Sequence, residues 1–213
     1  MFMTPLIFHA IDFSASQVGS GLAIAALIGT VVRLLCGALL DRGLCCSWPV
    51  RITTLLAITA DCVLIRAESY GGYLLGQLLL GCAAGLYWPA IELAVPLSCG
   101  SVPSGRGYAL VRSADALGIG LGALIGTVAA TLDTLRIVYA VEALCMGAVL
   151  VLISLQPLIN SPVVRDLKQV AANSVNNVSA ASRAWLIPLL PVLAISIVAT
   201  GILALQQLSL IHI

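Results

Sequence analysis

Residues 18–40, VGSGLAIAALIGTVVRLLCGALL, decide the fold, because they hold one charged residue, Arg33, among apolar and small residues. A helix needs about 20 such residues to cross the hydrocarbon core of a bilayer. Polar residues separate this stretch from further apolar windows at residues 48–65, 70–97, 113–131, 137–155 and 185–205. Residues 1–9 are apolar but too short to cross. We interpret them as the end of a first helix that is otherwise missing.

The composition of the whole chain also predicts lipid as its solvent. Of 213 residues, 9% are charged and 61% are apolar, and the mean hydropathy is +1.11. In soluble domains about a quarter of residues are charged, and one soluble core could not hide so much apolar surface. We therefore expect an all-α, polytopic membrane bundle in the inner or plasma membrane, with the lipid bilayer as a partner. The net charge of +1 indicates no nucleic-acid partner.

The Lys and Arg residues of the short loops predict the orientation, because they are enriched on the cytoplasmic side. We place the loop after residue 40 in the cytoplasm. On this topology Arg66 and Arg136 lie outside. The other Lys and Arg residues of the loops lie inside: Arg42, Arg51, Arg106, Arg112, Arg165, Lys168 and Arg183.

The windows divide the chain into four parts. Residues 1–156 form an amino-terminal bundle, residues 157–184 a polar cytoplasmic linker, and residues 185–207 the first helix of a second bundle. Residues 208–213, LSLIHI, read like the translation of a sequencing adapter, CTG TCT CTT ATA CAC ATC. We expect them to be an artefact and leave them out of the fold prediction. The alternative is a natural hydrophobic tail.

Residues 37–43, GALLDRG, carry a resemblance to a known family. Gly37, Leu39, Asp41 and Arg42 match the G-x-L-x-D-R-x-G-R-R pattern between the second and third helices of the major facilitator superfamily, whereas Leu44 stands at the second glycine and Cys45 and Cys46 at the basic pair. Independently of any family, Asp41 at a membrane edge can accept hydrogen bonds from the free N–H groups of another helix's N-terminus. The resemblance implies that Gly37, Asp41 and Arg42 latch two halves of a transporter together.

Two further stretches resemble the same family. Gln77-x-x-x-Gly81 and residues 85–90, GLYWPA, are similar to its fourth helix, with Gln77 where proton-coupled members often carry arginine. Gln77, Trp88 and Glu92 fall at helical spacing, and we expect them to line a water-filled cavity or, alternatively, a tight helix contact with Glu92 near the membrane surface. Gly118, Gly122 and Gly126 resemble the fifth helix, and glycines spaced by four favour close helix packing.

The resemblance implies a fold and a function. The fold is a six-helix half of a transporter with its first helix truncated, followed by a linker and one helix of the second half. The function is secondary active transport of a small solute by alternating access, with export as the expected direction. The partners are then a small-molecule substrate and the missing second half, without which the chain should not transport. The alternatives are a permease subunit of an ATP-driven transporter and a non-transporting membrane scaffold or sensor.

Charges inside the windows need partners, because a charge at the centre of a membrane helix costs about 3 kcal/mol on insertion scales. Counting along the helices places Arg33 at a depth similar to that of Glu92 and Asp115, so we predict that Arg33 pairs with one of them. Asp61 and Glu142 lie toward the opposite membrane face and are expected to be paired or protonated. A structural role for each is the simpler interpretation.

No pattern of catalytic or ligand-binding residues is recognisable. The only histidines are His9 and His212, and the sequence contains no H-E-x-x-H, G-x-S-x-G or phosphate-binding loop. The seven cysteines lack C-x-x-C spacing, so we expect reduced structural thiols. We predict no enzyme activity, no cofactor and no metal.

Overall fold

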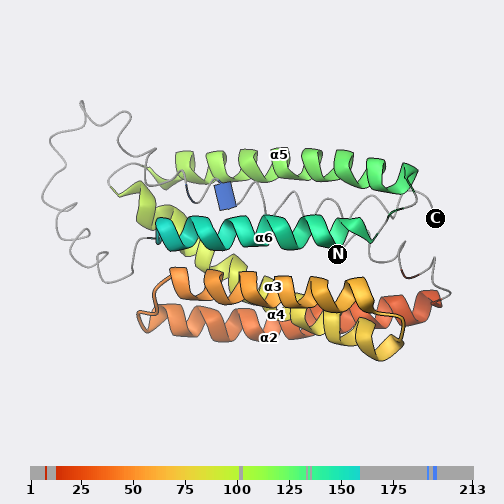
Figure 1. Cartoon of the computed structure of the whole chain (residues 1–213). Helices are drawn as coiled ribbons and strands as arrows, with labels where there is room; N and C mark the ends of the chain where they lie inside the picture. The colour runs from red at the N-terminus through yellow and green to blue at the C-terminus, as the bar shows by residue number, and fades with distance from the viewer. Residues whose placement is uncertain are drawn as a thin grey trace, which may run out of the picture.

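The computed structural model describes residues 8, 13–100, 103–132, 134, 136–158, 191 and 194–195. These residues form five α-helices, in the order α2, α3, α4, α5 and α6, and no strand occurs in this part of the chain (Figure 1). All five are long and apolar enough to cross a membrane. The prediction of an all-α, multi-pass membrane bundle is confirmed to this extent.

Local sequence explains where the first two of these helices begin and end. α2 spans Ala15–Asp41, and its N-cap Ser14 exchanges hydrogen bonds with Gln17 in a capping box. It stops before Gly43, whose φ of 98° is in the left-handed region. α3 spans Ser47–Arg66 with Pro49 in its first turn, where a missing N–H is tolerated.

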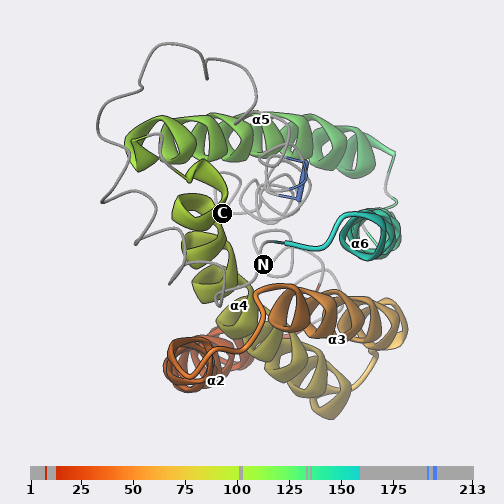
Figure 2. The ribbon, with the colours of Figure 1, turned by 90° about the vertical axis from the view of Figure 1, so that its left-hand side faces the viewer.

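α4 is the longest helix and runs obliquely through the bundle. It spans Tyr70–Cys99, starts at the N-cap Ser69 and ends before Gly100 at a φ of 56°. At 1.5 Å per residue it is about 45 Å long, which exceeds the hydrocarbon thickness. Figure 2 shows that α4 leads from the side of α2 and α3 across to α5. It is therefore the element that connects the two sides of the bundle.

α5 and α6 complete the described structure. α6 spans Ile137–Leu155, the bounds predicted from the sequence. α5 spans Ser104–Thr131, so it begins nine residues before the predicted start at residue 113. The predicted start is wrong because the hydropathy falls at Arg106 and Arg112, whereas the helical hydrogen bonds continue through these polar residues. Arg112 consequently lies within a helix and not in a loop.

Two helix pairs fix the register of the bundle. α3 and α6 are antiparallel: an Arg51 Nη donates to the Ile153 carbonyl at 3.5 Å, and an Arg136 Nη donates to the Ile65 carbonyl at 2.8 Å. α3 and α4 are also antiparallel, because the Thr53 hydroxyl donates to the Ala83 carbonyl at 3.0 Å and Leu64 lies against Gly76. Residues of different helices can thus be assigned to common levels along the bundle.

α2 and α4 run parallel and cross at very short range through small residues. A Cβ added at Gly85 would lie 2.6 Å from the Gly29 carbonyl oxygen, and one at Gly29 would lie 3.0 Å from the Gly81 carbonyl oxygen. A Cβ at Gly81 would overlap the backbone of Ala25. The contact joins Ala25-x-x-x-Gly29 to Gly81-x-x-x-Gly85, the small-residue spacing that lets membrane helices approach closely.

The buried apolar residues form layers along the bundle. One layer, at the end where α2 stops at Asp41 (the Asp41 end), joins all five helices and includes Val50, Ala94, Val111 and Ile153. A second, at the end where α4 begins (the Ser69 end), contains Phe8, Val18, Leu64, Tyr73, Leu80 and Tyr139. A smaller layer of Ala57, Ala83 and Met146 lies between them.

The outer surface is apolar, as contact with lipid requires. Leu34 on α2 is 72% exposed and Leu144 on α6 is 75% exposed. The outer faces of α2, α5 and α6 expose further large apolar side chains, among them Leu27, Leu35, Leu117, Leu124, Val128 and Leu155. In water such a surface would drive aggregation. In a bilayer the same surface faces hydrocarbon, where its exposure costs no free energy.

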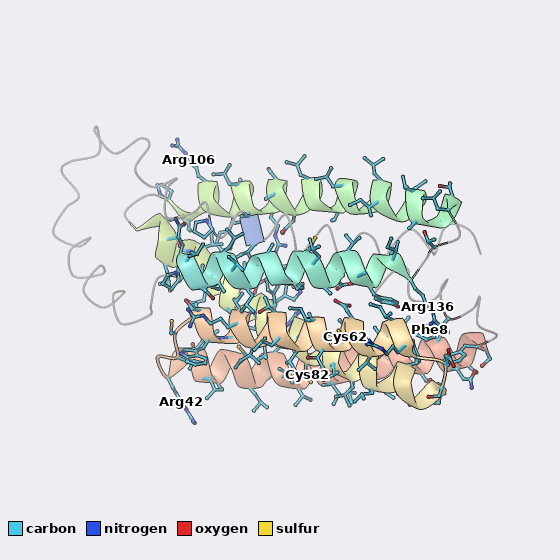
Figure 3. All side chains as sticks on the ribbon, viewed as in Figure 1. Phe8, Arg42, Cys62, Cys82, Arg106 and Arg136 are labelled. Atoms are coloured by element: carbon cyan, nitrogen blue, oxygen red, sulfur yellow. The ribbon has the colours of Figure 1, made fainter. Side chains whose placement is uncertain are left out.

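Arginine side chains mark both ends of the bundle. Arg42 and Arg106 lie at one end and Arg136 lies at the other (Figure 3). This arrangement agrees with the predicted grouping of Arg42 with Arg106. The assignment of that end to the cytoplasm stays a prediction, as do the cell membrane and the division into domains. The predicted linker from residue 159 on, nearly all of the helix at 185–207 and the tail at 208–213 lie outside the described residues.

Candidate functional site

Five residues of α4 and α5 form a polar cluster toward the Asp41 end, which we call the α4–α5 cluster: Trp88, Glu92, Tyr108, Arg112 and Asp115. An Nη of Arg112 lies 3.8 Å from Glu92 Oε1 and the other lies 3.3 Å from Asp115 Oδ2. The guanidinium carbon is 5.5 Å from the centroid of the Trp88 ring. The Tyr108 hydroxyl donates to the Glu92 backbone carbonyl at 3.0 Å.

Helical spacing explains why these side chains meet. Trp88 and Glu92 are four residues apart on α4, and Tyr108, Arg112 and Asp115 are separated by four and three residues on α5. Residues at these spacings share one face of a helix. Figure 2 shows that α4 crosses toward α5. The two faces meet where Arg112 of α5 contacts Glu92 and Trp88 of α4.

The charges of the α4–α5 cluster are only partly buried. The side chains of Arg112 and Glu92 are 58% and 56% exposed, whereas that of Asp115 is 8% exposed. The cluster therefore joins two carboxyl groups and one guanidinium to an indole ring. Ionic groups and an aromatic face are the groups that hold a polar or cationic organic ligand.

The cation in this cluster is not the one predicted. Arg33 lies on the exposed face of α2, and among the described residues no ion pair of Arg33 is present. Arg112 contacts both Glu92 and Asp115 instead. The predicted pairing of Arg33 with Glu92 or Asp115 is not found among the ion pairs of the described residues. Arg33 is exposed, whereas its neighbour Val32 lies at the contact with Gly85 of α4.

Gln77 does not belong to the α4–α5 cluster. It lies eleven residues before Trp88 on α4, or about 16 Å along the helix, and its side chain is fully buried. Neither its amide nitrogen nor its amide oxygen has a hydrogen-bond partner among the described residues. The structure thus brings Trp88 and Glu92 together and places Gln77 in the bundle interior.

The predicted latch residues lie at the Asp41 end. Asp41 is the last residue of α2 and Arg42 is its C-cap, and both are exposed. Within the described ranges neither side chain makes a hydrogen bond or ion pair, and a Cβ added at Gly37 would meet nothing within 4 Å. The latch stays a prediction.

The glycine run of α5 is buried. Gly118, Gly122 and Gly126 lie on one buried face of the helix, the side on which packing was expected. Sequence reasoning missed two residues of the α4–α5 cluster, Tyr108 and Arg112. The spacing of Arg112 and Asp115 on one helix face was the available signal, and it was overlooked because Arg112 had been placed in a loop.

Two further findings concern metal binding and the similarity of the chain to known proteins. Among the described residues no group of three or more His, Cys, Asp or Glu side chains could hold a metal ion. No family model, no curated protein and no solved structure matches the chain.

Proposed function

We propose that the chain belongs to a secondary active transporter that moves a small organic solute across the membrane by alternating access, with export as the direction. The arrangement of Arg112 between Glu92 and Asp115 over Trp88 carries this proposal. The resemblance of residues 37–43, 77–92 and 118–126 to the major facilitator superfamily supports it further.

The argument starts from the position of these charges in their helices. Glu92 lies seven residues, or about 10 Å, before the end of α4, and Arg112 lies eight residues, or about 12 Å, after the start of α5. Both side chains are more than half exposed. Lipid is a poor environment for such groups at this depth, so they are best explained by contact with water or with another part of a larger protein. A solute pathway between two helical halves provides both.

Adjacent residues of α5 provide a matched test of access. Ala116 lies one turn after Arg112 on the same side of α5, whereas Leu117 points away from it and is 64% exposed. We would introduce Ala116→Cys or Leu117→Cys into the full chain after replacing its seven cysteines, and label membrane vesicles with a membrane-impermeant maleimide. Water-filled access predicts labelling at position 116 and protection at position 117, where the thiol would face lipid.

Alternating access adds a second expectation. Position 116 should label from one side of the membrane at a time, and collapse of the proton or sodium gradient should change the labelling rate. A change driven by ATP would instead favour the permease subunit. Equal labelling at both positions, or labelling at position 116 that no gradient alters, would contradict transport and favour a scaffold.

A further inference from the structure

Arg33 is a charged side chain on the exposed side of α2, a helix whose outer surface otherwise faces lipid. It makes no ion pair with another described residue, and its side chain donates no hydrogen bond to one. The next two residues, Leu34 and Leu35, are 72% and 61% exposed. A guanidinium therefore stands beside a hydrocarbon-facing surface without a partner in the described part of the chain.

The position of Arg33 along α2 makes this exposure costly. α2 has 27 residues, so it is about 40 Å long against a hydrocarbon thickness of about 30 Å. Arg33 lies eight residues before Asp41, or about 12 Å, which places its Cα about 7 Å inside the hydrocarbon when the helix is centred. Helical side chains lean toward the N-terminus, and for Arg33 that direction leads away from the nearer membrane surface. Charged groups in this position pair with other groups or line water.

The described helices supply no acid for Arg33. Arg112 contacts Glu92 and Asp115, and no ion pair joins Arg33 to any acidic residue of the five helices. Three of the nine acidic residues of the chain lie outside these helices in the sequence: Asp12, Asp133 and Asp166. The carboxyl group that would complement Arg33 at its depth is thus not found in the described bundle.

The surface around Arg33 is built from small residues. Ala26, Thr30 and Gly37 lie seven and three residues before Arg33 and four residues after it, so they share one face of α2 with it. Ala26 and Thr30 are exposed, and a Cβ added at Gly37 would meet nothing within 4 Å. Small residues allow another membrane helix to approach closely. We call these four residues the Arg33 face.

We propose that the Arg33 face binds a membrane helix of a partner that carries a carboxyl group at the level of Arg33. The guanidinium donates N–H groups to that carboxylate, and the partner backbone packs over Ala26 and Gly37. A second copy of the chain is a poor occupant, because a parallel two-fold contact through this face would bring two guanidiniums together. The proposal concerns assembly and does not depend on transport.

Designed transmembrane peptides test the proposal in phosphatidylcholine vesicles that contain the full chain. Two peptides of leucine and alanine differ at one position, about 7 Å inside the end of the apolar stretch, where one carries Glu and the other Gln. Energy transfer from a labelled peptide to the labelled chain measures binding. We expect the Glu peptide to bind about tenfold more tightly than the Gln peptide.

Three variants separate the charge from the surface that surrounds it. Arg33→Gln should abolish the preference for the Glu peptide, whereas Arg66→Gln on α3 should leave it unchanged. The double variant Arg33→Leu, Leu34→Arg keeps the composition and nearly the depth, but turns the charge by about 100° onto the leucine side of α2. It should lose the preference, because the small residues no longer flank the guanidinium. Circular dichroism checks that each variant keeps its helices.

Each other outcome would overturn the proposal. Equal binding of the two peptides, or no binding of either, would leave Arg33 to lipid phosphate or water. A preference that survives in the double variant would show that any arginine on α2 suffices and that the Arg33 face is not a docking surface. Energy transfer between donor- and acceptor-labelled chains without peptide, lost in Arg33→Gln, would make a second copy the occupant. Maleimide access at position 116 involves a different helix, so either proposal can fail alone.

Discussion

Replacing Gly81 by alanine should destabilise the protein, because it adds a methyl group at the α2–α4 crossing. The new Cβ would overlap the Ala25 carbonyl oxygen, and the Ala25 Cα would lie at 2.9 Å. Overpacking of this kind costs about 1–3 kcal/mol, against a gain of about 1 kcal/mol from replacing glycine inside a helix. We therefore expect a net loss of about 0–2 kcal/mol, and a loss of about 1–3 kcal/mol relative to a glycine-to-alanine change that causes no overlap.

Gly147→Ala is the matched control. Gly147 lies inside α6, where an added Cβ meets nothing within 4 Å, so only the gain in helix propensity remains. Unfolding of the purified full chain in sodium dodecyl sulfate, followed by circular dichroism, compares the two variants. If Gly81→Ala were as stable as Gly147→Ala, the close crossing of α2 and α4 would be refuted.

A second pair of substitutions tests which atoms are responsible. At Gly81 the clashing atoms belong to the Ala25 backbone, so Ala25→Gly should not rescue Gly81→Ala. At Gly76 the added Cβ would instead meet the Leu64 side chain, so Leu64→Ala should partly rescue Gly76→Ala. Double-mutant cycles measure both interactions. Rescue at Gly81 by Ala25→Gly would contradict the backbone contact.

Three further predictions use the same purified protein. Tyr73→Phe removes the hydrogen bond that the buried hydroxyl donates to the Val18 carbonyl at 2.7 Å, and should lower the free energy of unfolding by about 1 kcal/mol. An unchanged value would reject this link between α2 and α4. Arg136→Met removes bonds at 2.8 and 3.3 Å to the Ile65 and Ala67 carbonyls. It should destabilise more than Arg66→Met, because among the described residues Arg66 bonds to Cys62 of its own helix. Equal losses would argue against an α6–α3 connection. Burial raises the pKa of the Cys46 thiol, which lies in the loop before α3, from 9.0 to about 11. Its alkylation by iodoacetamide should therefore stay slow until the pH nears about 11, and the stability from the neutral thiol should be lost between pH 9.0 and about 11. Rapid alkylation near pH 9.0, measured by mass spectrometry, would contradict this burial.

The helices could be predicted from sequence because lipid imposes a length and a composition on each of them. The bounds of α6 agree with the prediction, and those of α2, α3 and α4 differ by no more than three residues at each end. Only the start of α5 was missed. A membrane helix can extend beyond the hydrocarbon through polar residues such as Arg106, since its backbone hydrogen bonds do not depend on apolar side chains.

The candidate site could be predicted only in part, because sequence spacing fixes the level of a residue better than its direction. Trp88 and Glu92 were correctly placed on one face by their separation of four residues. Gln77 was assigned to the same stripe, although fifteen residues at 3.6 per turn rotate the stripe by about 60° between Gln77 and Glu92. The oblique course of α4 then brings different parts of the stripe against different neighbours (Figure 2). Arg112 was not considered as a partner of Glu92, because it had been placed in the loop before the predicted start of α5.

The environments of the charged and polar residues differ from place to place within the bundle. At Asp41 and Arg42 the charges are exposed at a helix end, where they cost little. In the α4–α5 cluster Arg112 lies between two carboxyl groups at distances of 3.8 and 3.3 Å. In the bundle interior Asp61 and Gln77 are completely buried, and the polar atoms of both side chains make no hydrogen bond to a described residue. Burial without such a bond is costly, whereas exposure or pairing lowers the cost of a polar group. Because α4 carries Gln77 in the interior and Trp88 in the α4–α5 cluster, one helix connects the two environments, and a shift of α4 would affect both.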